Sequence, residues 1–139
     1  MSEGYAGDLT PRQAWELLAG DDAALLVDVR TDAELAYVGV PDTSELDRDL
    51  ITVAWERFGD GARNPDFTGQ LRAAGARPDT PLVFLCRSGA RSAAAARAAT
   101  AAGLGPAYNV LEGFEGGLDH DGHRGRDGWR AEGLPWRQS

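Results

Sequence analysis

Apolar residues gather in short runs along the chain, and these runs alternate with stretches of helical character. The run at 24–29 is almost continuously apolar, as expected for a parallel strand buried on both faces. A weaker signal at Tyr5-Ala6 indicates an edge strand. The complete set of stronger strand predictions is 24–29, 50–55, 82–85 and 107–111.

Helix-start signals lie between the predicted strands. Thr10 precedes Gln13 by three residues, and Thr31 precedes Glu34 by the same spacing. Each pair is the signature of a capping box, in which the two residues satisfy each other's free backbone N–H groups. The pattern therefore predicts helices over 10–20 and 31–38.

Two further helices complete the alternation. Asn64-Pro65 opens a helix that is expected to reach Gly75, and the alanine-rich segment 93–99 forms another. Strands alternating with helices predict an α/β domain of three layers, with a mainly parallel central sheet of about five strands flanked by helices. A chain of 139 residues fits a single domain spanning 1–139.

The charge of the chain is unevenly distributed. The formal net charge is −8, and residues 21–60 carry eleven acidic and three basic side chains, which accounts for all of it. No basic stripe is present, so a nucleic-acid partner is not expected. No apolar run has the length of a membrane span and the start lacks a leader pattern, so we expect no membrane partner and a cytoplasmic location.

The strongest chemical signal follows the strand at 82–85. Cys86 comes next, then a compact polar loop with Arg87 and Arg91 on either side of Ser-Gly-Ala, and then the alanine-rich helix. A helix start collects free N–H groups and the positive end of the helix dipole, so it stabilises an anion there. A cysteine in this position is a candidate thiolate nucleophile. The competing interpretation is a small buried apolar cysteine, but two arginines so close are unwelcome in a dry core.

These residues make the chain resemble the single-domain rhodaneses, a family of sulfurtransferases. The resemblance rests on 26–30 with Glu34, on the loop 86–92, on the glycine turn 113–117 after its strand, and on the closing segment 128–135. Where the family usually has Gly-His-Ile-Pro-Gly-Ala, this chain has a different sequence at 37–42. We interpret 118–127 as a loop insertion, judged against ordinary connection lengths. In the tail we expect Trp129, Leu134 and Trp136 to act as packing anchors.

The resemblance implies a two-step reaction without a cofactor. The Cys86 thiolate would attack the sulfane sulfur of a small anionic donor, thiosulfate or another persulfide, and become a persulfide. A thiophilic acceptor, which includes a thiol on an acceptor protein, would then remove that sulfur. The residues expected to bind the anion are Arg87, Ser88, Gly89, Ala90, Arg91 and Ser92.

The resemblance also assigns supporting roles. One loop arginine is expected to point inward and brace the loop, with Asp28 as its partner. Arg30 is expected to pair with Glu34 or with the loop. Ser88 and Ser92 are candidates to bind the persulfide or to cap the helix, with capping favoured for Ser92.

Three alternatives compete with this interpretation. Cysteine phosphatases and arsenate reductases also use a cysteine–loop–arginine cradle, but here four residues separate Cys86 from Arg91 where the phosphatases have five. A rhodanese-like docking module without catalysis is the second alternative, and retention of the cysteine and both arginines disfavours it. The third is a metal site at His120 and His123; a polar glycine-rich loop is favoured there, because no ligand-spacing motif is present.

Overall fold

The computed structural model describes residues 4–46, 50–56, 63–87, 89–116 and 128–137. Five strands form one sheet in the order β1-β6-β5-β2-β4, and every neighbouring pair is parallel. The strands are β1 (Gly7–Leu9), β2 (Leu25–Asp28), β4 (Ile51–Thr52), β5 (Leu82–Leu85) and β6 (Ala107–Val110). The central sheet expected from the sequence is therefore confirmed, with its strand number.

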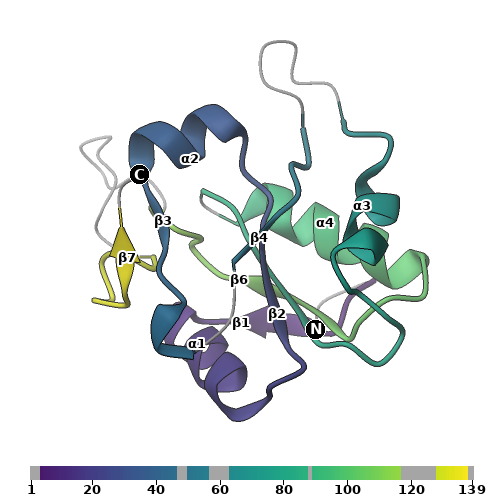
Figure 1. Cartoon of the computed structure of the whole chain (residues 1–139), viewed down its shortest axis with the longest axis horizontal. Coiled ribbons are helices and arrows are strands. Elements are labelled where there is room, and N and C mark those ends of the chain that lie inside the picture. Colours follow the sequence, from purple (N-terminus) through teal and green to yellow (C-terminus); the bar gives the residue numbers. More distant parts are fainter. Residues whose placement is uncertain (1–3, 47–49, 57–62, 88, 117–127, 138–139) are drawn as a thin grey trace.

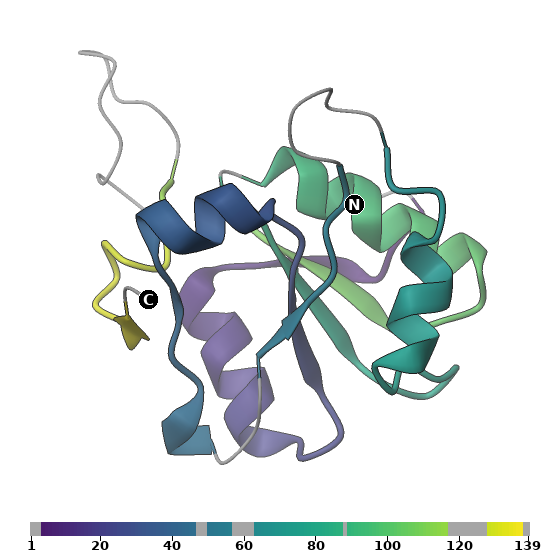
Figure 2. The ribbon, with the colours of Figure 1, turned by 45° about the horizontal axis from the view of Figure 1, so that its top comes forward.

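Helices cover both faces of this sheet (Figures 1 and 2). One core contains Leu26, Val83 and Val110 packed against α1, and the other contains Val27 and Phe84 packed against α3 and α4. Successive side chains of a strand point to opposite faces, which is why neighbours such as Leu26 and Val27 enter different cores. The helices are α1 (Pro11–Gly20), α2 (Asp32–Val38), α3 (Phe67–Ala73) and α4 (Ala90–Ala101), with a short 3-10 turn, η1, at Ser44–Leu46.

Both predicted capping boxes form. The Thr10 hydroxyl accepts from the Gln13 N–H while the Gln13 side chain accepts from the Thr10 N–H. Thr31 and Glu34 repeat this arrangement at the start of α2. Local sequence therefore set these two helix starts.

Other boundaries differ from the expectation. The third helix begins at Phe67 and not at Asn64-Pro65, because the Asn64 side chain accepts from the Asp66 N–H at 3.0 Å and closes a turn first. The edge strand lies at 7–9, slightly later than Tyr5-Ala6. In the expected strand 50–55 only Ile51–Thr52 is regular.

A second, two-stranded ribbon was not anticipated. β3 (Val40–Pro41) pairs antiparallel with β7 (Trp136–Arg137) and joins the tail to the segment after α2. Of the tail residues expected to anchor by packing, Trp129 and Leu134 are buried, but Trp136 is 42% exposed. Trp136 nevertheless packs, because its ring lies edge-on to Phe114 with 5.9 Å between the ring centroids, although strand pairing leaves part of it at the surface.

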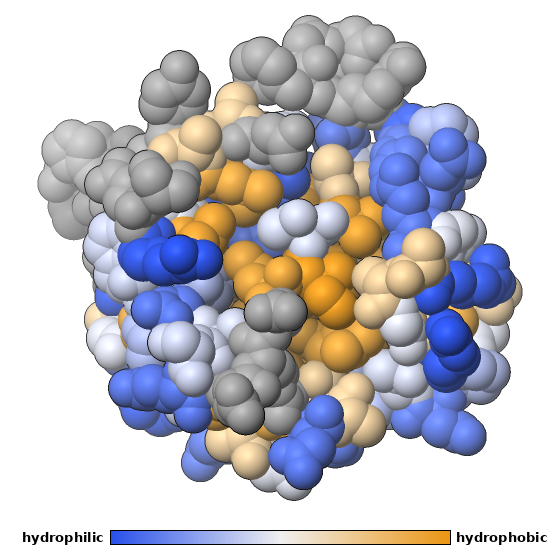
Figure 3. Space-filling model, viewed as in Figure 1, coloured by the Kyte–Doolittle hydropathy of each residue, from blue (hydrophilic) through white to orange (hydrophobic). Residues whose placement is uncertain are grey.

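The middle of the face drawn in Figure 3 is apolar, and in the same view Figure 1 places the outer strand β4 there. Leu50, Ile51 and Trp55 are only partly buried along this segment. Two residues of regular strand offer little free backbone for pairing with another chain. No helix in the described part of the chain has both the length and the apolar character needed to cross a bilayer.

Candidate active site

Cys86 lies where β5 ends and α4 is about to begin. Gly89 is the N-cap of α4, with φ of 116° and ψ of −15°, a left-handed conformation that glycine adopts without a Cβ clash. This turn directs the Gly89 N–H at the cysteine, with 3.0 Å between the nitrogen and Sγ. The sulfur therefore accepts a main-chain hydrogen bond at the positive end of a twelve-residue helix.

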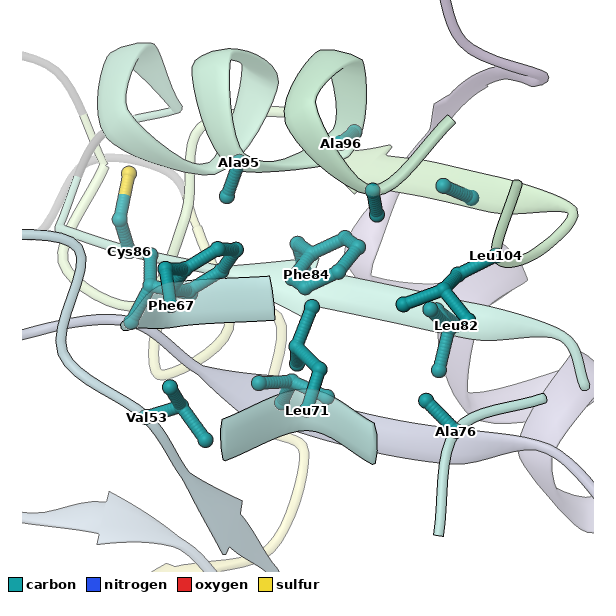
Figure 4. Close-up of a cluster of buried hydrophobic side chains, with 14 residues drawn as sticks. Val53, Phe67, Leu71, Ala76, Leu82, Phe84, Cys86, Ala95, Ala96 and Leu104 are labelled. Atoms are coloured by element: carbon teal, nitrogen blue, oxygen red, sulfur yellow. The ribbon is translucent and has the colours of Figure 1, made fainter. Parts of the chain in front are cut away.

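The cysteine also belongs to the apolar core. Its residue is only 1% exposed and packs in the cluster that contains Val53, Phe67 and Ala95. Figure 4 shows the Cβ–Sγ bond directed toward the start of α4. Phe67 and Phe84 lie beside the cysteine, toward the interior of the apolar cluster. Both sequence-based interpretations of Cys86 thus describe part of its surroundings: the residue is buried, and its sulfur has polar contacts.

Ser92 provides the second polar contact of the sulfur. Its Oγ lies 3.2 Å from Sγ of Cys86, 3.2 Å from the Gly89 carbonyl oxygen and 2.5 Å from Oδ1 of Asn109. Ser92 occupies the first turn of α4, and the cap is Gly89 without a side-chain bond. The expectation that Ser92 caps the helix was wrong, because the left-handed Gly89 takes that place.

The brace of the loop is an ion pair between helices. Arg91 donates to both carboxylate oxygens of Glu34, at 2.6 and 2.7 Å, and about a fifth of each side chain is exposed. Burial raises the pKa of Glu34, but the hydrogen bonds from Arg91 and Thr31 outweigh it and lower the pKa from 4.5 to about 2. The Glu34 carboxylate in turn raises the pKa of Arg91.

Asp28 has a different partner from the one expected. Its carboxylate accepts from Nε and Nη2 of Arg30, at 2.9 and 2.7 Å, and neither side chain is exposed to solvent. Arg30 also donates to the Gly39 carbonyl and stacks over the Phe114 ring at 4.3 Å. The pairing of Asp28 with a loop arginine, and of Arg30 with Glu34 or the loop, was wrong. Arg30 follows Asp28 by only two residues, so its guanidinium meets this carboxylate before that of any residue farther away in the chain.

Arg87 differs from the other two arginines. It is exposed, and it has no side-chain partner within the ranges that the structure describes. Its carbonyl oxygen accepts from the Glu115 N–H at 3.0 Å, as the Cys86 carbonyl accepts from the Phe114 N–H at 2.8 Å. The backbone of Arg87 is therefore held by the turn after β6, while its side chain is exposed.

The turn after β6 holds the backbone of the cysteine loop through close contacts. Gly113 has φ of 60°, and a Cβ at this position would overlap the Cys86 carbonyl oxygen and the Arg87 backbone. Only a glycine allows the two segments to come this close. The two hydrogen bonds from Phe114 and Glu115 depend on this approach.

Comparison with known proteins places this geometry in a family. The family profile described as STR4 middle domain matches residues 6–139, nearly the whole chain. The chain belongs to this family. The crystal structure of Rv0390 from M. tuberculosis is 57% identical, with a TM-score of 0.89 over 97% of this chain and 99% of that one.

Two further relatives carry descriptive names. The solution structure of a 30 kDa polysulfide-sulfur transferase homodimer from Wolinella succinogenes is 25% identical, with a TM-score of 0.64 over 99% of this chain and 82% of that chain. A thylakoid rhodanese-like chloroplast protein of Oryza sativa subsp. indica is 29% identical over 94% of this chain, which spans 25% of that protein. The single-domain rhodanese-like fold expected from the sequence is thus confirmed.

Within this rhodanese-like fold the structure brings Cys86, Gly89 and Ser92 into contact, whereas Arg91 donates its hydrogen bonds to Glu34. Asn109 was missed by sequence reasoning, because nothing local shows that β6 lies beside α4. Several expectations fall outside the described residues: Ser88, the insertion 118–127, and the histidines His120 and His123.

Proposed function

We propose that this rhodanese-like protein is a sulfurtransferase that carries sulfur on Cys86. The observation that carries the proposal is the Gly89 N–H directed at Sγ from the N-terminus of α4, at 3.0 Å. The main-chain donor stabilises the negative charge of the thiolate on Sγ, and the positive end of the helix dipole would also attract the charge that a persulfide anion carries on its outer sulfur. The name of the Wolinella relative adds support at the level of reaction type.

The reaction has two steps that balance. The Cys86 thiolate attacks the outer sulfur of a donor such as thiosulfate, the S–S bond of the donor breaks, and sulfite leaves with the bonding electron pair. Cys86 is then a persulfide anion. A thiophilic acceptor attacks the terminal sulfur, the new S–S bond breaks, and the thiolate is restored. No cofactor enters either step.

Arg87 is the group best suited to receive the anionic donor. It is exposed and adjacent to Cys86, whereas Arg91 already gives two hydrogen bonds to Glu34 and Arg30 is buried on Asp28. The engagement of Arg91 by Glu34 also weakens the phosphatase alternative. In a phosphatase the arginine of the loop binds phosphate in a bidentate manner, and here that arginine is engaged by a carboxylate.

Intact mass tests the proposal directly. The protein is mixed with thiosulfate, and its mass is recorded before and after cyanide is added. We expect a gain of one sulfur atom that cyanide removes, in the wild type and not in Cys86→Ser. Absence of the adduct together with turnover of an aryl phosphate would identify a phosphatase, and stable capture of a partner without either activity would identify a docking module.

A second measurement tests the role of Arg87. Arg87→Gln is expected to slow persulfide formation from thiosulfate by about tenfold, the effect of losing one charge-assisted contact to the anion. Arg72→Gln, an exposed arginine on α3, is the matched control for the change in charge and should react like the wild type. Equal rates in Arg87→Gln and the control would refute this role.

A further inference from the structure

A string of hydrogen bonds runs from the cysteine, at the end of the central strand β5, to the edge strand β1. Cys86 contacts Ser92 on α4, Ser92 contacts Asn109 on β6, Asn109 contacts Asp8 on β1, and Asp8 contacts Tyr5. Ser92 and Asn109 are buried, at 0% and 4% exposure, while Asp8 is at the surface. The string links the candidate nucleophile to a carboxylate that takes no part in the proposed reaction.

Asp8 determines which way the Asn109 amide faces. A carboxylate can only accept hydrogen bonds, and Asp8 Oδ1 lies 3.1 Å from the Asn109 amide nitrogen. The Tyr5 hydroxyl donates to the same oxygen at 2.7 Å. If the amide were reversed, its oxygen would face this carboxylate without a proton between them. The amide oxygen of Asn109 therefore faces Ser92.

The orientation of Asn109 in turn assigns the proton of Ser92. A serine hydroxyl has one proton and three neighbours compete for it here, of which the Asn109 Oδ1 is nearest at 2.5 Å. Two oxygens at that distance need a proton between them, and only Ser92 can supply it. The 3.2 Å contact with Sγ is then a hydrogen bond only when the sulfur itself carries the proton.

We propose that Asp8 and Asn109 are positioning residues that hold the Ser92 hydroxyl as an acceptor toward Cys86. In this arrangement Ser92 stabilises the thiol form, and the Gly89 N–H alone among these contacts stabilises the anion. The inference deepens the proposed function of Cys86, but it concerns the ionisation of the thiol, which can be measured without any sulfur donor.

Other charged groups around the sulfur stay unchanged in the variants that follow. From α4 and α2 these are Arg91 and its partner Glu34, and Glu56 after β4 also acts on Arg91. The end of β2 contributes the Asp28–Arg30 pair, and the cysteine loop itself contributes Arg87. Differences between variants therefore report on the hydrogen-bond string.

The test is the rate of alkylation of Cys86 by iodoacetamide, followed by intact mass as a function of pH. The wild type is compared with Ser92→Ala, Asp8→Asn and the double variant, after circular dichroism has shown that each is folded. Ser92→Ala removes an acceptor from the thiol. It should alkylate about two- to tenfold faster below the wild-type pH midpoint, the equilibrium equivalent of one hydrogen bond. Slower alkylation would overturn the proposal, because it would mean that Ser92 donates to the thiolate.

Asp8→Asn distinguishes the string from a simple loss of charge. When an amide replaces the Asp8 carboxylate, Asn109 can reverse, donate to Ser92 and release the Ser92 proton toward Sγ. Asp8→Asn should therefore also accelerate alkylation at low pH, but only when Ser92 is present. Asp79→Asn, an exposed carboxylate in the turn before β5, controls for net charge. The proposal would be overturned if Asp8→Asn accelerated alkylation equally in the Ser92→Ala background. It would also be overturned if Asp8→Asn caused no acceleration when Ser92 is present.

The two proposals fail separately. A wild type that forms no persulfide but shows this alkylation pattern would refute the sulfurtransferase and leave the hydrogen-bond string intact. A wild type that forms the persulfide without the pattern would do the reverse.

Discussion

The ion pair between Glu34 and Arg91 offers the most exact test of how the cysteine loop is held. It joins α2 to the first turn of α4, and Glu34 also completes the capping box of its own helix. Glu34→Gln separates these roles. Gln13 performs the same capping in α1, so a glutamine keeps the cap but loses the charge and one of the two acceptors for Arg91, because its amide nitrogen cannot accept a hydrogen bond.

The size of the effect follows from the lowered pKa of Glu34. A fall from 4.5 to about 2 corresponds to about 3 kcal/mol of folding free energy at neutral pH, at about 1.4 kcal/mol for each pH unit. About a fifth of each side chain is exposed, and solvent screening reduces the contribution to about 1–2 kcal/mol. Because the pKa is lower in the folded state, this stabilisation is present above pH 4.5 and is lost as the pH falls toward 2.

Urea unfolding of four proteins measures it: the wild type, Glu34→Gln, Arg91→Gln and the double variant. At pH 7 the coupling free energy between the two positions should be about 1–2 kcal/mol. At pH 3 the difference between the wild type and Glu34→Gln should fall to roughly half or less. Glu16→Gln, the same change on the exposed face of α1, should be neutral at both pH values.

A destabilisation of Glu34→Gln that stays constant from pH 7 to pH 3 would refute the reasoning, since it would arise from packing and not from charge. Zero coupling between the two positions would refute it as well. Alkylation of Cys86 in the same variants shows whether the ion pair also positions the loop.

Three further changes test other parts of the support. Gly113→Ala should destabilise the protein by about 2 kcal/mol or more in urea unfolding, because its Cβ meets the backbone under the loop, whereas Gly20→Ala meets nothing and should be neutral or slightly stabilising. Asp28→Asn leaves the buried Arg30 guanidinium without its counter-charge and should cost about 3–5 kcal/mol; an effect below about 1 kcal/mol would contradict the ion pair. Trp129→Ala should cost about 3–5 kcal/mol, measured as a lowered urea midpoint, because its ring is fully buried.

Local sequence was a sufficient guide wherever neighbouring residues satisfy one another. Thr10 with Gln13 and Thr31 with Glu34 cap their helices through bonds that span only three residues. The continuous apolar run of β2 predicted a strand covered on both faces, and its neighbours Leu26 and Val27 do enter two separate cores. The junction of strand, Cys86 and helix was likewise readable, because it is contiguous in the chain.

Partner choice was decided only by the tertiary structure. Three arginines lie near the loop or the end of the neighbouring strand, and each could pair with any nearby carboxylate; folding gave Asp28 to Arg30, gave Glu34 to Arg91 and left Arg87 exposed. The contact of Asn109 with Ser92 depends on β6 lying beside β5 and α4, which no local pattern specifies. Sequence alone thus determined the main helices and strands of the sheet and singled out Cys86 as the candidate nucleophile, since these depend on short-range periodicity, capping and contiguity. The environment of Cys86 depends on distances between segments far apart in the chain, and these exist only once the sheet has assembled.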